Sequence, residues 1–136
     1  MKLSKEKYSE LIAIAKSARG RSYSPYSRFA VGAALLTKDG KVYTGTNVEN
    51  SSYSATLCAE RVAIFHAVAE GEREFDAIAV VGGPAGESTP EECQPCAVCL
   101  QVMAEFCGPD FEIVTESDGE VRVYPFTELL PKPFKF

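Results

Sequence analysis

The sequence contains no tryptophan, only one histidine and no long apolar run. None of its apolar stretches approaches the ~18 residues that a membrane-spanning helix needs, and residues 1–6 lack the apolar region of a secretory signal peptide. The basic residues are scattered and the net charge is −5, which disfavours binding to a phosphate backbone. A Gly-rich phosphate loop and internal repeats are also missing. These absences predict a cytoplasmic protein that binds a small neutral or cationic molecule, with no nucleic acid and no membrane as partner.

The residues that are present favour a single globular domain spanning residues 1–136. A chain of this length, with 46% hydrophobic residues, can bury a sufficient core without disulfides or a structural metal to stabilise it. The chain also has five cysteines. In a cytosolic protein they indicate metal ligands, catalytic groups or buried thiols in preference to disulfides.

Apolar periodicity and turn residues predict the secondary structure. A first helix begins after Ser4 as N-cap and ends near Gly20, and Asp-Gly pairs at residues 39–40 and 118–119 predict two hairpins. We expect strands at Phe29–Thr37, Val42–Thr46, Ile78–Val81, Phe111–Thr115 and Val121–Tyr124, helices at Leu57–Ala69 and Pro95–Phe106, and a last helical turn at Thr127–Leu130. Residues 82–94, rich in Gly, Pro and acid, are expected to form a surface loop.

This order of elements predicts an α/β fold with three layers, α/β/α, in which a mixed sheet of about five strands carries helices on both faces. The two strand–helix–strand units are expected to be right-handed crossovers. The second and third helices would then begin near the C-terminal ends of the strands before them. Ligand sites of open α/β sheets lie at such ends.

Three cysteines and one carboxylate sit where these two helices are expected to begin. Cys58, Glu60 and Arg61 fall within one turn, and Cys96 and Cys99 are spaced i, i+3 on the next helix. Zinc favours thiolates in a tetrahedral set, and a catalytic zinc keeps one position for water. Glu60 is placed to move a proton from that water. Arg61 can donate hydrogen bonds to the thiolates and offset part of their charge without binding the metal itself.

Other interpretations of the same cysteines stay open at this point. A lone C-x-x-C also occurs in redox and structural-zinc sites, and Cys93 would be a fourth ligand that closes a structural site. Pro95 argues against this because it breaks the helical register between Cys93 and Cys96. Cys107 is expected to be a buried thiol near a helix end, and His66 a packing or surface residue.

The motifs C-A-E-R at residues 58–61 and P-C-x-x-C-x-Q at residues 95–101 resemble those of the zinc-dependent nucleoside deaminases, specifically the small cytidine deaminases with a three-cysteine zinc site. Further blocks match the family in the same order, and together they cover most of the chain. These blocks are Pro25–Ser27, Phe29–Leu35, Asn47–Asn50 and Glu128–Pro131.

The resemblance implies a role for each matching residue. Cys58, Cys96 and Cys99 match the ligands of one zinc ion per chain, and Glu60 matches the proton shuttle. The positions that match the substrate pocket are Phe29 beside the base, Asn47 and Glu49 at the ribose hydroxyls, Tyr53, the Ala59 backbone, and Phe134, which reaches a neighbouring subunit in the family's homotetramers.

The chain departs from the family pattern at two positions beside the ligands. Ala97 and Leu100 stand where the family usually has Gly and Arg. Ala97 is a minor change unless its backbone needs a positive φ. Leu100 removes a positive charge near the thiolates. Residues 84–94 match no family block and are expected to alter the pocket entrance.

The resemblance implies hydrolytic deamination of cytidine and deoxycytidine to uridine or deoxyuridine and ammonia, in pyrimidine salvage. Zinc-bound hydroxide would be the nucleophile and Glu60 the proton shuttle. Phosphorylated nucleotides are not expected as substrates because no basic cluster lies near the motifs. Two rivals remain: a deaminase of another aminopyrimidine or a nucleoside-like antibiotic, and a structural-zinc or redox module without this activity.

Overall fold

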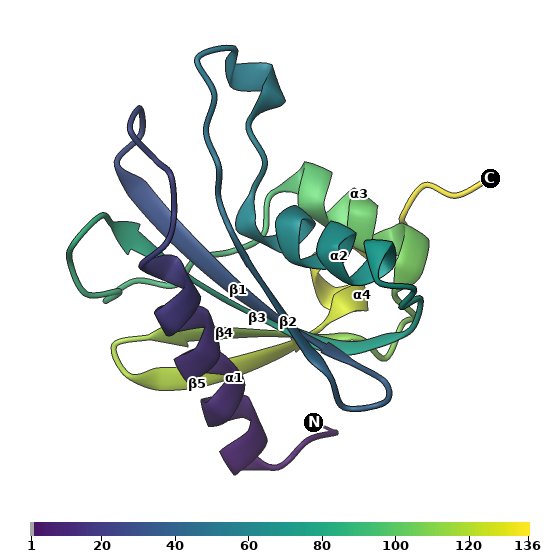
Figure 1. Cartoon of the computed structure of the whole chain (residues 1–136). Coiled ribbons are helices and arrows are strands. Elements are labelled where there is room, and N and C mark those ends of the chain that lie inside the picture. The colour runs from purple at the N-terminus through teal and green to yellow at the C-terminus, as the bar shows by residue number, and fades with distance from the viewer. Residues whose placement is uncertain (1) are drawn as a thin grey trace.

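The computed structural model describes residues 2–136 (Figure 1). Its elements, in chain order, are α1 (Lys5–Arg19), β1 (Phe29–Thr37), β2 (Val42–Thr46), the 3₁₀ turn η1 (Tyr53–Ala55), α2 (Ala59–Ala69), β3 (Phe75–Pro84), α3 (Ala97–Phe106), β4 (Glu112–Ser117), β5 (Glu120–Pro125) and α4 (Phe126–Leu129). None of the helices in the described part of the chain is long and apolar enough to cross a membrane.

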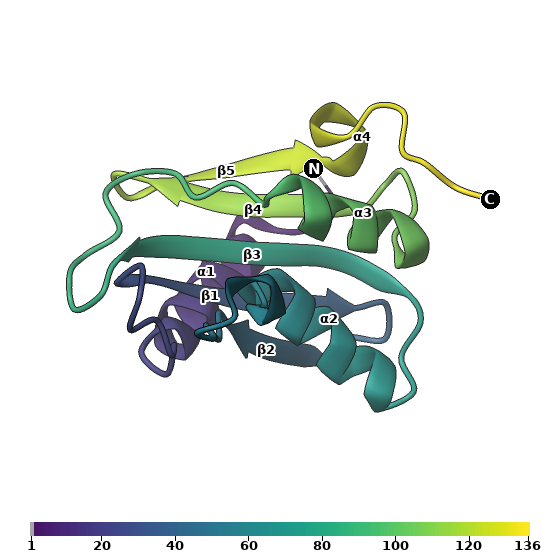
Figure 2. The ribbon, with the colours of Figure 1, turned by 90° about the horizontal axis from the view of Figure 1, so that it is seen from above.

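The strands form one sheet in the order β2-β1-β3-β4-β5. Only β3 and β4 pair in parallel, and the other neighbours are antiparallel. Helix α1 covers one face of the sheet, and α2 and α3 lie together on the other (Figure 2). The predicted three-layer fold with a mixed five-stranded sheet is therefore confirmed.

Helix α1 forms where the apolar period predicts it. Ser4 is its N-cap and its side chain accepts a hydrogen bond from the backbone N–H of Lys7 at 3.1 Å. The apolar side of the helix is buried against alternate residues of β1 and β3. Because the residues between them point to the opposite face, both faces of these two strands are covered, which explains their nearly continuous apolar sequence.

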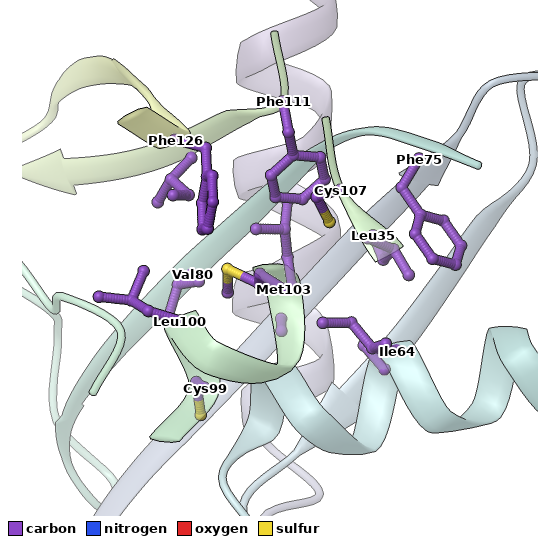
Figure 3. Close-up of a cluster of buried hydrophobic side chains, with 14 of the residues drawn as sticks. Leu35, Ile64, Phe75, Val80, Cys99, Leu100, Met103, Cys107, Phe111 and Phe126 are labelled. Carbon is purple, nitrogen blue, oxygen red and sulfur yellow. The ribbon is translucent and has the colours of Figure 1, made fainter. Parts of the chain in front are cut away.

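The second core lies under α2 and α3 (Figure 3). Met103 of α3 and Ile64 of α2 pack with Leu35 and Val80 of the sheet, and Phe111 and Phe126 close the core beside β4 and α4. Cys99, one of the predicted metal ligands, belongs to this core and is fully buried. The metal site thus rests directly on the packed interior.

Several boundaries differ from those predicted, most by one or two residues and those of β3 by three. Helices α2 and α3 each begin two residues later, because Cys58 and Cys96 adopt extended backbone with ψ of 155° and 167° and act as N-caps. Pro95 therefore precedes the helix and is not its first residue. Strand β3 runs from Phe75 to Pro84, well beyond Ile78–Val81, because β1 pairs with it along nearly its whole length.

Helix α2 approaches the sheet closely at one glycine. A β-carbon on Gly45 of β2 would lie 2.3 Å from the carbonyl oxygen of Ala59 and 2.5 Å from the backbone nitrogen of Ala63. Both distances are well inside van der Waals contact, so the backbone of the helix rests on the backbone of the strand. Gly45 thereby fixes how near the first turn of α2 lies to the sheet.

Candidate active site

The sheet brings the two cysteine motifs to the same end of the molecule. Strand β1 pairs with both β2 and β3, and its first residues face Thr46 at the end of β2 and Pro84 at the end of β3. The segments that leave these two strands lead to α2 and α3. The N-termini of α2 and α3 therefore meet at one end of these strands, as the fold prediction required.

Cys58 and Cys96 each occupy the N-cap position of a helix, and Cys99 lies one turn into α3. Cys96 Sγ is 3.8 Å from Cys58 Sγ and 3.5 Å from Cys99 Sγ. A tetrahedral zinc with Zn–S bonds of ~2.3 Å requires sulfur atoms about 3.8 Å apart. The three sulfur atoms therefore fit a zinc ion with small adjustments, and a fourth position stays open.

Cys93 is not part of this group. Within residues 2–136, the sulfur atoms close enough to share an ion are those of Cys58, Cys96 and Cys99. Burial raises the pKa of Cys93 to about 12, with a further contribution from Glu60 nearby, so this thiol is neutral. A closed four-cysteine site is not formed.

Arg61 contacts the sulfur of Cys58. Its guanidinium donates a hydrogen bond to Cys58 Sγ at 3.4 Å. The pKa of Cys58 is lowered to about 5, because its sulfur accepts a hydrogen bond from Cys99 and one from Arg61. The pKa of Cys99 is raised by the same sharing of a proton and by burial. At least one sulfur is thus ready to bind a cation as thiolate at neutral pH.

Glu60 lies beside the sulfur atoms with its side chain only 3% exposed. Burial raises its pKa to about 7, and the Cys58 thiolate adds to that shift. A carboxyl group with such a pKa can both take up and release a proton near neutral pH. Although Cys58 and Glu60 are only two residues apart, both reach the same cavity, because Cys58 is at the N-cap and not inside the helix.

A cavity of about 240 Å³ opens in front of this group. Its walls contain five of the residues predicted to bind or transform a substrate, namely Phe29, Asn47, Glu49, Tyr53 and Glu60, with Cys58 and Cys96 at the metal end. The other lining residues are Ser27, Val31, Thr56, Leu57, Cys93 and Gln94. Among residues 2–136, no lysine or arginine lines this cavity.

Asn47 is buried at the edge of the cavity and holds the start of β1. Its Nδ2 donates to the Phe29 carbonyl at 2.8 Å, and its Oδ1 accepts from the Val31 N–H at 2.9 Å and from the Ser22 hydroxyl. An amide offers two donors and two acceptors. One N–H of Asn47 is left for a ligand.

Glu49 is held by the loop before β1. Its Oε1 accepts from the backbone N–H groups of Tyr26 and Ser27, each at 3.0 Å, and its Oε2 accepts from the Ser27 hydroxyl. The Ser27 hydroxyl is the main reason that the pKa of Glu49 is lowered, and the two backbone donors add to the effect. Glu49 is therefore an ionised carboxylate with one acceptor position free on Oε2.

Two of the predicted pocket residues are not in this cavity. Ala59 is fully buried as the first residue of α2, and its carbonyl packs on Gly45. Phe134 lies on the C-terminal tail, 67% exposed, and its carbonyl accepts from Gln101 of α3 at 2.9 Å. The tail leaves the molecule beyond α3 (Figures 1 and 2).

Sequence reasoning missed Ser27 and the wall position of Cys93. A β-carbon on Gly82 would lie 2.8 Å from Cys93 Sγ and 2.9 Å from the Phe29 ring, so both side chains pack on the bare backbone of β3. Ser27 had a signal in the sequence, because it belongs to a block that matches the family. Cys93 had none beyond its spacing from Cys96.

The two departures from the family pattern have different consequences. Ala97 needs no positive φ, since the only non-glycine residues in the described chain with that conformation are Arg28 and Asp118. Leu100 is buried in the core with Met103 and Phe126 and carries no charge (Figure 3). Arg61 is the one cation that donates to the ligand sulfurs in the described structure.

Comparison with known proteins agrees with this geometry. Residues 5–115 match the model of the cytidine and deoxycytidylate deaminase zinc-binding region. A cytidine deaminase from Sporosarcina psychrophila is 47% identical over 126 residues, which are 92% of this chain and 89% of that protein. A blasticidin-S deaminase from Bacillus cereus is 31% identical over 74% of each chain.

A solved structure shows the same fold. The cytidine deaminase from Burkholderia pseudomallei superposes with a TM-score of 0.85 at 48% identity, covering 97% of this chain and 100% of the other. The same conclusion follows from the fold of this chain, from its three-thiol group that fits zinc and from the family match. The chain belongs to the family of cytidine and deoxycytidylate deaminases, and it is a zinc-dependent hydrolase of the cytidine deaminase type.

Proposed function

We propose that the enzyme hydrolyses cytidine and deoxycytidine to uridine or deoxyuridine and ammonia. The observation that carries this proposal is that the three-thiol group and buried Glu60 adjoin a cavity whose walls also contain Asn47 and Glu49. The thiols and Glu60 suit hydrolysis at an amino-substituted ring carbon. Asn47 and Glu49 suit the hydroxyl groups of a sugar.

Cys58, Cys96 and Cys99 would hold the zinc ion, which supplies Lewis acidity that lowers the pKa of a coordinated water towards ~7. Glu60 takes the proton that the attacking water gives up and delivers it to ring nitrogen 3. In the second half of the reaction Glu60 takes the proton of the hydroxyl group that has added to ring carbon 4 and passes it to the amino group, so that the carbon–nitrogen bond breaks and ammonia departs. Its raised pKa of about 7 suits a group that must accept and donate in turn. Arg61 offsets part of the negative charge of the ligands.

Glu49 and Asn47 together offer a sugar one acceptor and one donor. The remaining position on Glu49 Oε2 accepts from a hydroxyl, and the remaining N–H of Asn47 donates to one. Because the protein already fixes both side chains, little conformational entropy is lost when the sugar binds. Phe29 and Tyr53 supply apolar walls.

A 5′-phosphate is not favoured in this cavity. Glu49 and Glu60 line it, and neither a lysine nor an arginine does. A phosphate dianion would therefore be desolvated without a partner of opposite charge. The nucleoside is the preferred substrate over its monophosphate.

The proposal is tested by following the fall in ultraviolet absorbance when zinc-loaded protein meets cytidine, deoxycytidine, cytosine, cytidine monophosphate or blasticidin S. We expect kcat/KM for cytidine to exceed that for cytosine and for the monophosphate by about a hundredfold or more, because the sugar contacts contribute binding energy to the reacting complex. Faster turnover of cytosine or blasticidin S than of cytidine would overturn the assignment and favour the rival substrate class.

The enzyme is further proposed to act as a homotetramer in which Phe134 completes the pocket of a neighbouring subunit. The outer faces of α2 and α3 expose Phe65 and Val98, and the tail exposes Phe134 and Phe136. Exposed aromatic side chains of this kind indicate a covered surface in the assembly. The tail residues 131–136 do not line the cavity of their own chain.

Mixing two inactive variants tests this arrangement. The Glu60→Gln chain keeps its tail and the Phe134→Ala chain keeps its Glu60, so shared oligomers contain pockets with both groups. We expect co-refolded mixtures to regain about a quarter of wild-type turnover by random assortment of subunits. No regain, or a sedimentation mass equal to the 14.7 kDa monomer, would contradict the proposal. Each variant refolded alone is the control.

A role in pyrimidine salvage in the cytoplasm, as one domain spanning residues 1–136, stays a prediction. The five cysteines are all free, which suits a reducing compartment. The two core clusters share one sheet, which supports one domain. Returning a uridine nucleoside to the pool is the chemical consequence of the proposed reaction.

A further inference from the structure

The segment from residue 85 to residue 96 connects β3 to α3 and forms one wall of the active-site cavity. Its last part carries three functional positions in close succession. Cys93 lines the cavity, Pro95 is buried, and Cys96 is both N-cap and metal ligand. The position of this segment therefore decides the shape of the cavity and the place of one ligand.

Packing alone does not fix the segment. A second cavity of about 210 Å³ lies beneath it, lined by Phe29, residues 82–84 of β3 and residues 90–92 of the segment itself. Where a void replaces packed neighbours, dispersion contacts on that side are lost. Polar contacts therefore help to hold this part of the chain in place.

Glu92 provides such contacts at the point where the segment turns toward the cavity. Its Oε1 accepts a hydrogen bond from the Tyr124 hydroxyl of β5 at 2.7 Å and another from the Thr115 hydroxyl of β4. Thr115 is fully buried, so its hydroxyl depends on this partner. Both donors belong to paired strands, which makes them rigid anchors.

The ionised form of Glu92 is the one that makes these bonds. Burial acts to raise the pKa of this carboxyl group, but hydrogen bonds from Thr115, Tyr124 and Gln94 and the charge of Arg122 hold it below its ordinary value. Hydrogen bonds to a charged acceptor are stronger than those between neutral groups. The contact is therefore made by a full carboxylate at neutral pH.

We propose that Glu92 is a positioning residue of the active site, which clamps the segment before α3 to strands β4 and β5 and so holds Cys93 in the cavity wall and Cys96 at the metal. This inference rests on the proposed function for its kinetic consequences. The contacts that carry it are independent of the substrate. Glu92 acts one residue from Cys93 and four from Cys96.

Glu92→Ala and Glu92→Gln form the test, with Glu91→Ala as matched control. Glu91 is the exposed neighbour of Glu92 on the same segment. Glutamine keeps the Oε1 acceptor and should retain both hydroxyl donors. We expect Glu92→Ala to release zinc to a chromogenic chelator about tenfold faster and to raise KM for cytidine several-fold. Glu92→Gln, which keeps the acceptor but loses the charge, should fall between wild type and Glu92→Ala in both measurements. Glu91→Ala should remain within about twofold of wild type.

Tyr124→Phe gives a second route that removes one donor and leaves the backbone of β5 intact. In the Glu92→Ala background the Tyr124→Phe change should add no further acceleration of zinc release, since both changes break the same contact. If Glu92→Ala does not fold, the rate of zinc release from Tyr124→Phe alone tests the proposal: release faster than from wild type supports it, and an equal rate overturns it.

Equal zinc release in Glu92→Ala and Glu91→Ala would overturn the proposal, and so would a lower melting temperature of Glu92→Ala with unchanged release and KM. The release assay needs no substrate. A protein that fails to deaminate cytidine but releases zinc faster when Glu92 is removed would therefore refute the proposed substrate and support the clamp.

Discussion

The Glu60→Gln variant is expected to lose turnover of cytidine by about a thousandfold or more, while it keeps its fold and one zinc per chain. General acid–base catalysis contributes about 10²–10⁴-fold where one group acts. Here the same carboxyl group is proposed to move protons in both halves of the reaction. The amide of glutamine has nearly the same volume but neither accepts nor donates a proton at neutral pH.

The surroundings of Glu60 make this variant informative. The side chain is almost fully buried, and a charged carboxylate there is costly. Glutamine leaves no charge to bury, so the melting temperature should stay equal or rise. Loss of activity can then not be attributed to unfolding. Metal analysis, thermal unfolding and the absorbance assay on one preparation separate a change in zinc content from a change in stability and a change in turnover.

Glu70→Gln is the matched control, because Glu70 lies at the end of the same helix with its side chain exposed. The same change of chemistry should leave turnover within about twofold of wild type, as expected for an exposed residue far from special features. A Glu60→Gln enzyme that turns over within tenfold of wild type would remove Glu60 from the proton transfers.

The Cys96→Ala variant is expected to lose both zinc and activity. Two thiols, one of them buried, remain of the tetrahedral set, and structural and catalytic zinc sites need three or four ligands. Because the side chain of Cys96 makes no capping hydrogen bond, alanine at this N-cap should cost the fold little. Circular dichroism should therefore show normal helix content beside a zinc content below about one-tenth per chain.

Cys93→Ala is the control for this variant. It removes a thiol only three residues away that lies outside the three-sulfur group. It should keep one zinc per chain. Stoichiometric zinc in Cys96→Ala, or loss of zinc in Cys93→Ala, would contradict the ligand set and revive the closed four-cysteine site.

The fold could be predicted from the sequence because its signals are local. Helix α1 has a capping serine and an apolar period, and β1 is continuously apolar because both of its faces are covered. Asp-Gly turns mark both hairpins. The starts of α2 and α3 were misplaced because the extended backbone of Cys58 and Cys96 leaves no trace in periodicity.

The chemical end of the site was also predictable, since the ligands and Glu60 lie in two short motifs. The walls were not. Glu92 accepts hydrogen bonds from Thr115 and Tyr124, which lie 23 and 32 residues away in the sequence. Asn47 makes two of its hydrogen bonds to the backbone at the start of β1. Such contacts depend on how the sheet brings distant segments together. The Gly, Pro and acidic residues of the segment from residue 85 to residue 96 predict a loop, but they do not encode the path that the loop takes.

The missing side chain at Gly45 has a consequence for how this enzyme tolerates change. The Ala59 carbonyl that rests on it belongs to the residue between Cys58, a proposed metal ligand, and Glu60, the proposed acid–base group. Any larger residue would lift that turn and carry Cys58 away from Cys96 and Cys99. A position with no functional group, outside the cavity wall, is thus expected to accept no larger side chain without a shift of the first turn of α2. A library that spares only the residues touching substrate would lose active members there.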